Sequence, residues 1–312
     1  MSKKTELRAD LNRIGYQLGG AHLTQEARRA TFGTFAQAMR AKGYGIESAE
    51  QIGGKHLQAF VERRLAQGVR SRTIANEMSH VRAVLIHCGK EGLARNPAYS
   101  NKALGIGRGS RIGTKGPLSD AAIRGFQKQM DRFGRSAIGH VLELQRALGL
   151  REAEAIRGGN PETLARWQRE LQERDHVRVI EGTKGGRARD VHPGNLSRAR
   201  MAVERARATL QASGQRYLVT RADGSAAAGL KQALGIYRNV CHRAGIQSHR
   251  ARYAFAQERM QTYRQIERLS EREALAATSL DLGTATAVGA MLRVCTRSGA
   301  SKGESQRDKI HA

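Results

Sequence analysis

A glycine-rich segment at residues 101–116 divides the chain into two parts that need separate hydrophobic cores. Its glycines alternate with basic residues, among them Arg108, Arg111 and Lys115. Glycine makes such a segment flexible and the positive charges allow it to lie along phosphates, although a plain interdomain hinge would have the same composition. The 312 residues are enough for two domains. We predict domains at 1–100 and 117–300, this linker between them, and a disordered tail at 301–312.

The first domain is predicted to be a compact bundle of short helices. Its apolar residues recur near helical spacing through most of the segment. Thr24 is expected to cap one helix, because its hydroxyl can accept from first-turn amides, and Ser71 is expected to begin another. Asn96-Pro97 should end the bundle, since the residue before a proline disfavours the helical conformation. Positive charge gathers on these helices at Arg63, Arg64, Arg70 and Arg72.

The second domain is predicted to be mainly helical. Ser136–Leu148 carries an apolar helical face, Gly149 is placed to close that helix, and a new helix opens at Arg151. Because the first amides of a helix lack intrahelical partners, Arg151 stands at a natural anion-binding position. Further helices are expected at about 195–213, at about 229–244 and after Ser248.

One β-hairpin interrupts these helices. The segments 176–180 and 187–191 are short, with alternating or β-branched residues, and the glycine-rich turn 182–186 separates them. This pattern is typical of two antiparallel strands joined by a tight turn. The predicted fold class is therefore mainly α with a small β-hairpin, which makes the second domain α+β.

The charge of the chain points to a polyanionic partner. Fifty-four Lys and Arg against 28 Asp and Glu give a net charge of +26, spread along the sequence. This excess is larger than solubility requires of a chain this size, so we predict double-stranded DNA as the partner. The four arginines of the first domain and the three basic linker residues are its candidate contacts. No apolar run is long enough to span a membrane, and the N-terminus lacks a secretory signal.

The cysteines and histidines predict neither disulfides nor a metal site. Cys88, Cys241 and Cys295 are widely spaced and odd in number, which argues against a disulfide framework and favours a reducing cytoplasm. None of the ten histidines has metal-ligand spacing with cysteine or carboxylate residues. We predict no metal and no cofactor.

A His-x-x-Arg pattern at His249 and Arg252 is the central chemical feature. Residues three apart lie on one side of a helix, so an imidazole and a guanidinium can face the same point. This pairing suits a phosphate that gains negative charge during a reaction. Taken singly, each of these residues, and also Arg151 and Lys184, has a plain structural reading as a solvated or capped side chain.

Together, four residues and their order carry a resemblance to a known family. They are Arg151 in Gly-Leu-Arg-x-x-Glu, Lys184 in a Thr-Lys-Gly-Gly turn, and His249 and Arg252, followed by Leu282-Gly283. The pattern resembles the tyrosine recombinases, the phage-type integrases of mobile elements. The resemblance covers most of the chain and implies a SAM-like helical core-binding domain, a linker and an α+β catalytic domain.

The resemblance also implies an activity. Members of the family carry out site-specific DNA recombination and integration through a phosphotyrosine, commonly as tetramers on paired sites. Arg151 and Arg252 would clamp the scissile phosphate, Lys184 would act on the leaving 5′ oxygen, and His249 would assist. We accordingly expect a cytoplasmic, nucleoid-associated protein and allow for a homo-oligomer.

The end of the sequence departs from the family pattern. Thr284 stands after Leu282-Gly283, where the family has a second histidine, and no tyrosine follows Tyr263. Tyr263 precedes Leu282-Gly283 and is expected to serve in helix packing. The sequence therefore predicts DNA binding without strand cleavage.

Loss of one base just before the Thr284 codon would explain this departure. A permitted set of codons, read in the restored frame, gives a histidine at the place of Thr284 and tyrosines at the places of Met291 and Thr296. Part of this is forced, because the shifted codon at Met291 ends in AT and encodes only Tyr, His, Asn or Asp. We therefore hypothesise a frameshift that removed the nucleophile.

Three hypotheses follow from the sequence. The first is an integrase of the tyrosine recombinase family, disabled in this copy. The second is a non-catalytic DNA-binding protein of recombinase ancestry with a regulatory or accessory role. The third is an unrelated basic helical protein in which the His249–Arg252 pattern is accidental.

Overall fold

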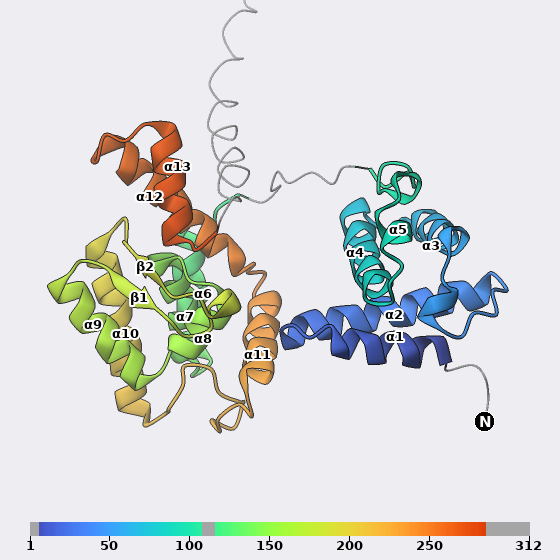
Figure 1. The fold of residues 1–312 in the computed structure, drawn as a ribbon. Helices are drawn as coiled ribbons and strands as arrows, with labels where there is room; N and C mark the ends of the chain where they lie inside the picture. Colours follow the sequence, from blue (N-terminus) through green and yellow to red (C-terminus); the bar gives the residue numbers. More distant parts are fainter. Residues whose placement is uncertain (1–5, 108–115, 285–312) are drawn as a thin grey trace, which may run out of the picture. The chain divides into compact units, whose positions relative to one another are not determined.

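The computed structural model describes residues 6–107 and 116–284, which form two compact units divided near residue 110 (Figure 1). The predicted tail at 301–312 and the predicted nucleophile positions at Met291 and Thr296 lie outside the described residues. The basic linker residues Arg108, Arg111 and Lys115 also lie outside them. The first described stretch belongs to the first unit and the second stretch to the second unit.

The first unit is a bundle of helices around one apolar core. Its α-helices are α1 (Glu6–Gln17), α2 (His22–Ala41), α3 (Gly54–Ala66), α4 (Ser71–His87) and α5 (Glu91–Arg95), with 3-10 turns at Ala49–Gln51 and Pro97–Tyr99. Helix α2 packs against α1, α3 and α4. Phe32, Phe35 and Phe60 are fully buried between these helices, and Phe35 and Phe60 stack at 5.1 Å between ring centroids. These three rings are part of the apolar core that the helices share.

Two local features of this unit differ from the sequence reading. The expectation that Thr24 caps a helix is wrong, because α2 begins at His22, after an extended Ala21 that makes no side-chain cap. The chain at 101–107, assigned to the linker, continues the first unit: Ile106 is buried in its core, and Arg82 donates to Asn101 and to the carbonyl of Tyr99. Ser71 begins α4 as expected.

The second unit surrounds helix α7 (Ser136–Leu148), whose bounds match the prediction. The other helices are α6 (Asp120–Arg132), α8 (Glu152–Gly158), α9 (Pro161–Glu173), α10 (Leu196–Ser213), α11 (Leu230–Arg243), α12 (His249–Gln265) and α13 (Glu271–Asp281). Helix α7 packs against α6, α8, α10 and α12. Trp167 and Tyr237 are fully buried in this core. The apolar face of α7 therefore organises the unit around its centre.

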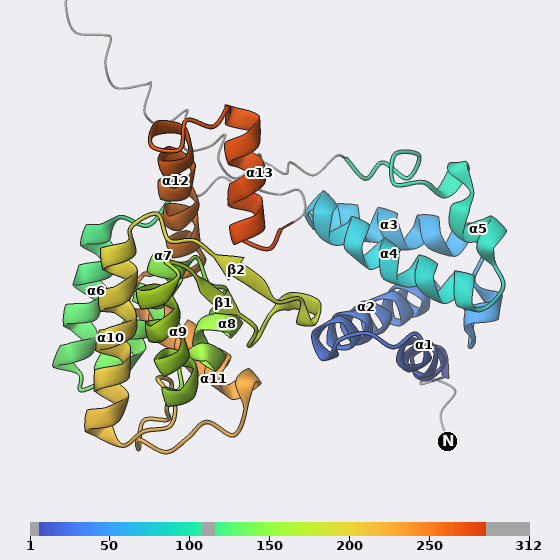
Figure 2. The same ribbon diagram turned by 60° about the vertical axis from the view of Figure 1, so that its left-hand side comes forward.

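The hairpin is present but shorter than predicted. Strands β1 (Val177–Val179) and β2 (Arg189–Val191) pair antiparallel, with Val177 opposite Val191 (Figure 2). A 3-10 turn at Lys184–Gly186 lies between them, and Gly182 begins the turn with φ +70°. A Cβ at Gly182 would lie 2.5 Å from the carbonyl oxygen of Ala153. Only glycine allows this approach, which brings the hairpin against the start of α8.

The described residues contain no helix that is long and apolar enough to cross a membrane. The same part of the chain has no group of three or more histidines, cysteines or acidic residues that could hold a metal ion. With helices throughout and a two-stranded sheet, the fold class predicted from the sequence is confirmed.

Candidate functional site

The turn between α7 and α8 brings Arg151 close to helix α12. Gly149 ends α7 in the left-handed conformation at φ +58°, as its position in the sequence predicts. A Cβ on Gly149 would lie 2.4 Å from the ring of Phe255 in α12. The absence of a side chain therefore lets α12 approach this turn closely. Arg151 is the N-cap residue of α8, two residues farther along the chain.

A single buried carboxylate, Glu154, gathers the arginines of this region. Its oxygens accept from the backbone amide of Arg151 at 2.7 Å and from the Arg151 guanidinium at 2.6 Å. The Arg189 guanidinium, from β2, donates to both oxygens at 2.7 Å. Arg252, from α12, lies 3.9 Å from the same carboxylate. Three guanidiniums from three elements thus surround one negative charge.

The charges of this cluster do not balance. Burial by itself would raise the pKa of Glu154, but the hydrogen bond and charge of Arg189, together with Arg151, lower it below its ordinary value. Burial, and then the neighbouring charges of Arg151 and Arg189, lower the pKa of Arg252 to about 9. The cluster remains rich in positive charge and is suited to an anion.

Backbone carbonyls at the end of α13 hold the two predicted site arginines. Arg252 donates to the carbonyls of Gly149 and Leu282. Arg151 donates to the carbonyl of Leu282 at 3.2 Å and to that of Gly283 at 2.9 Å. The Arg252 side chain is 3% exposed, whereas that of Arg151 is 24% exposed. Arg151 is therefore the member of the pair that solvent can reach.

Asp281, the last residue of α13, anchors these carbonyls. Its buried carboxylate accepts from Arg259 at 3.1 Å, from the Tyr263 hydroxyl at 2.8 Å and from the backbone amide of His192 at 3.1 Å. The backbone carbonyl of Asp281 accepts from Arg189 at 2.8 Å. A carboxylate at a helix C-terminus opposes the helix dipole, so these partners offset an unfavourable position. Asp281 thus joins α12, α13 and β2 next to the arginine pair.

Tyr263 has the environment of a packing residue. Its hydroxyl donates to Asp281, and the Arg259 guanidinium lies 3.9 Å from the centre of its ring. Burial, and then the negative charge of Asp281, raise the pKa of Tyr263 to about 12. A phenol held this way is a poor nucleophile at neutral pH.

The structure gives the backbone positions of His249 and Lys184. His249 begins α12 and lies one turn before Arg252, as the His-x-x-Arg spacing predicts. Its ring meets Tyr253 edge-on at 5.0 Å, and the preceding Ser248 hydroxyl donates to Glu152 at 2.6 Å. Lys184 begins the 3-10 segment within the hairpin turn, and its side chain is outside the described part of the structure.

Sequence reasoning missed Arg189 and Asp281 as parts of this site. Arg189 is buried on the same side of β2 as Val191. The available signal for Arg189 was a charged residue at a strand position that faces the core. Such a residue needs a buried partner of opposite charge, and Glu154 at the start of helix α8 could supply it. For Asp281 the signal was an acidic residue at the predicted end of a helix, directly before Leu282-Gly283.

The arginines predicted to contact DNA in the first unit have different surroundings. Arg64 donates to both carboxylate oxygens of Glu77, at 2.9 and 2.6 Å, and its side chain is 17% exposed. Arg70 and Arg72 are exposed at the start of α4, and Arg63 is half-buried on α3. The donors of Arg64 are therefore already engaged within the protein.

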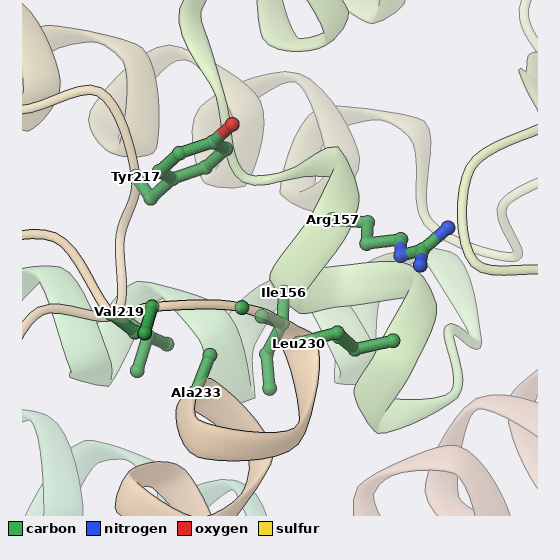
Figure 3. A pocket seen from close by; sticks show the side chains of 9 residues that line it. Ile156, Arg157, Tyr217, Val219, Leu230 and Ala233 are labelled. Carbon is green, nitrogen blue, oxygen red and sulfur yellow. The ribbon is translucent and has the colours of Figure 1, made fainter. Parts of the chain in front are cut away.

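A separate pocket of about 300 Å³ lies beside the end of α8 (Figure 3). Ile156, Leu230 and Ala233 form part of its apolar wall, and Arg157 and Tyr217 supply polar groups. None of the arginines around Glu154 lines this pocket. The pocket is therefore distinct from the charged cluster.

Comparison with known proteins identifies both units. A family model described as phage integrase, N-terminal, matches residues 1–94, and one described as integrase matches residues 105–258. No curated protein sequence matches the chain. The fold resembles the integrase of transposon Tn1549 in complex with transposon right end DNA, with a TM-score of 0.61, 13% identity and 94% of each chain covered.

Two solved structures of lambda integrase are also similar. One is a tetramer bound to a Holliday junction, with a TM-score of 0.58, 12% identity, and coverage of 91% of this chain and 76% of that chain. The other is a dimer bound to a COC′ core site, with a TM-score of 0.56, 12% identity, and coverage of 97% and 80%. At these identities the likeness establishes the fold. The two family models together match most of the chain. The chain therefore belongs to the phage integrase family and has the fold of the tyrosine recombinases.

Proposed function

We propose that this chain is a tyrosine-recombinase-like protein of site-specific DNA recombination, and that its second unit binds a backbone phosphate beside Arg151 and Arg252. The observation that supports this most directly is the charge of the cluster: Arg151, Arg189 and Arg252 share the one carboxylate of Glu154. A phosphodiester carries the negative charge that this cluster lacks, and guanidiniums match its geometry.

The two arginines of the proposed phosphate site have different parts in it. Arg151 is partly exposed and bonds main-chain carbonyls with one nitrogen, so a phosphate can take the place of Leu282 and Gly283 as its acceptor. Arg252 is buried, so it contributes positive charge to the site from within the protein. Such preorganised charge stabilises the additional negative charge of a phosphoryl-transfer transition state.

Lys184 and His249 complete the proposed chemistry where a tyrosine is supplied. The tyrosine hydroxyl would give its proton to His249, and its oxygen would attack phosphorus to form a phosphotyrosine. The bond from phosphorus to the 5′ oxygen would break, and Lys184 would protonate that oxygen. No external oxidant or reductant is needed for this exchange of one ester for another. In this sequence no tyrosine follows Tyr263, and the Tyr263 hydroxyl is bonded to Asp281. We therefore propose that the chain binds DNA without cleaving it.

The first unit and linker supply the remaining proposed contacts. Arg63, Arg70 and Arg72, and the linker residues Arg108, Arg111 and Lys115, are our candidates for phosphate contacts, while Arg64 is a weaker one because it bonds Glu77. Nucleoid association would follow from such binding. By analogy with the dimeric and tetrameric integrase complexes, we propose that the chain assembles on DNA, which light scattering with and without a bound duplex would test.

Selection from a random duplex pool, followed by binding measurements on the selected duplex, tests the phosphate site. We expect Arg151→Ala to weaken binding roughly 10-fold or more, because a charged contact to phosphate is lost. Arg157→Ala on the same helix is the matched control, since Arg157 is exposed and lies outside the cluster. Equal effects of the two substitutions would contradict the proposal.

A nicked duplex that traps covalent intermediates tests the absence of cleavage. We expect no adduct that survives SDS with this chain, and an adduct after insertion of one base before the Thr284 codon. An adduct formed by the unaltered chain would contradict the first expectation. Sequencing the gene across codons 280–300 would test the frameshift, because bases that encode no tyrosine in the restored frame would exclude it.

A regulatory or accessory DNA-binding role is the second candidate. It is favoured by the environment of Tyr263, which is buried and bonded to Asp281. Intact reading frames of this same form in sister genes would support retention for binding alone. The third hypothesis, an unrelated basic helical protein, is wrong because the chain belongs to the phage integrase family.

A further inference from the structure

The first unit carries a basic hollow on the surface of helices α1 and α2. The hollow has a volume of about 560 Å³, and among the described residues no acidic side chain lines it. Its lining consists of Arg8, Arg29, Ala30, Gly33, Thr34, Ala36, Gln37 and Arg40. Two helices that pack on each other thus direct three arginines toward one space.

Among the described residues, Arg8 and Arg29 have neither a hydrogen-bond partner nor an ion-pair partner. Both are exposed. By contrast, Arg13 on α1 is paired with Asp10 at 2.5 Å, and Arg28 on α2 donates to the carbonyl of Gly19 at 2.7 Å. The guanidiniums of Arg8 and Arg29 are therefore available to an external acceptor.

Gly33 lies next to the Arg8 side chain in the hollow. Gly33 lies inside α2, where glycine costs about 0.5–1 kcal/mol relative to alanine. A Cβ at this position would lie 3.5 Å from Nε of Arg8 and 3.7 Å from its Cζ. A longer side chain would compete with the guanidinium for this space. The backbone of α2 at Gly33 thus lies beside the Arg8 side chain at the hollow, and a single Cβ there would make only ordinary van der Waals contact with it.

We propose that this hollow binds a backbone phosphate of duplex DNA through Arg8 and Arg29. The inference rests on the proposed function, that the chain binds DNA, and adds a contact site that the charge pattern of the sequence did not single out. Planar guanidiniums donate paired hydrogen bonds that match phosphate oxygens. Gln37 adds a side-chain amide to the same surface. With a net charge of +26 on the chain, a polyanion is the favoured ligand.

Salt dependence of binding to a duplex of arbitrary sequence measures the contact. For the double variant Arg8→Gln/Arg29→Gln we expect the slope of log K against log salt to fall by about 0.9, because the two arginines share one phosphate contact and each such contact contributes about 0.9. The double variant Arg13→Gln/Arg95→Gln is the matched control. It removes the same charge from exposed positions, but Arg13 and Arg95 are paired with Asp10 and Glu91. We expect the control to change the slope by less than about 0.5.

A second variant tests the hollow without removing an arginine. Gly33→Glu would place a carboxylate beside Arg8, and we expect it to weaken DNA binding about as much as the double arginine variant. Unaltered circular dichroism would show that each variant is folded.

The outcomes separate this inference from the proposed function. Absence of duplex binding by the unaltered chain would overturn both. Normal binding together with equal slopes for the hollow variant and its control would overturn the hollow alone. Polyglutamate offers a further test as a competitor of DNA. If it competes with DNA for the unaltered chain, and the hollow variant binds polyglutamate more weakly but DNA as before, the hollow would bind an acidic protein. That result would also overturn the inference.

Discussion

The arginines of the two units have opposite environments. Around Glu154 in the second unit, Arg189 and Arg252 are buried, and their donors are engaged by a carboxylate and by main-chain carbonyls. On α1 and α2 in the first unit, Arg8 and Arg29 are exposed around an open hollow that no acidic residue of the described chain lines. One group is held in place by partners within the protein, whereas the other has no partner among the described residues.

This difference shows why a count of charges does not identify a binding surface. The sequence contains 54 lysines and arginines, and its charge pattern named Arg64 as a candidate for DNA contact but not Arg8. The structure pairs Arg64 with Glu77, so it contributes to folding. A buried guanidinium gives geometry and charge to a site, while an exposed one gives affinity that salt screens.

Substitution of Glu154 is expected to change the stability of the protein most. Glu154→Gln would leave three guanidiniums around a neutral amide, and removal of one partner of a buried pair costs about 3–5 kcal/mol. We expect that loss in the free energy of unfolding, measured with urea. Glu204→Gln, an exposed change on α10, should cost less than about 0.5 kcal/mol. A similar small loss for Glu154→Gln would show that the cluster is not held by its carboxylate.

Asp281 is the next test. Asp281→Asn would leave Arg259 without the buried counter-ion that it contacts at 3.1 Å, with an expected loss of about 2–4 kcal/mol. Asp190→Asn is the control. It breaks an exposed ion pair with Arg178, so the loss of stability should stay under about 1 kcal/mol. Thermal unfolding of both variants would measure the difference. Equal losses would argue against the anchoring role of Asp281.

Within the first unit, the comparison can be made between two arginines. Arg64→Gln breaks a largely buried pair with Glu77 and should destabilise the protein by about 1–3 kcal/mol. Arg8→Gln should change stability by less than about 0.5 kcal/mol and yet weaken DNA binding. Denaturant titration and binding assays on both variants would separate these effects. If Arg8→Gln destabilised the protein as much as Arg64→Gln, Arg8 would be structural.

The smallest effect is a pH dependence that arises from His192. The hydrogen bond to Asp281 raises the pKa of His192 above its ordinary value of 6.5, although burial opposes this. The stabilisation is therefore fully present below about pH 6.5 and is lost as the pH rises through the folded-state pKa. Half of the His192 side chain is exposed, so we expect at most about 1 kcal/mol. His192→Gln should remove this pH dependence, and its persistence would assign it to another group.

The sequence allowed the local structure and the order of the site residues to be predicted. Helical spacing defined α7, and the glycine at 149 marked its end, because these signals act between near neighbours in the chain. The family pattern named Arg151 and Arg252, which the structure brings to the same carbonyl of Leu282. Arg189 was predicted only as a strand residue, since its bond to Glu154 joins elements that the sequence does not relate.

By itself, then, the sequence determined two helical regions, one hairpin, an excess of positive charge and the absence of a tyrosine after Tyr263. Tertiary structure decided which charged groups meet and which face solvent. It buried Asp281 among Arg259, Tyr263 and His192, and it left Arg8 and Arg29 exposed. The physical reason is that periodicity and composition act along the chain, whereas desolvation and ion pairing depend on which distant segments pack together.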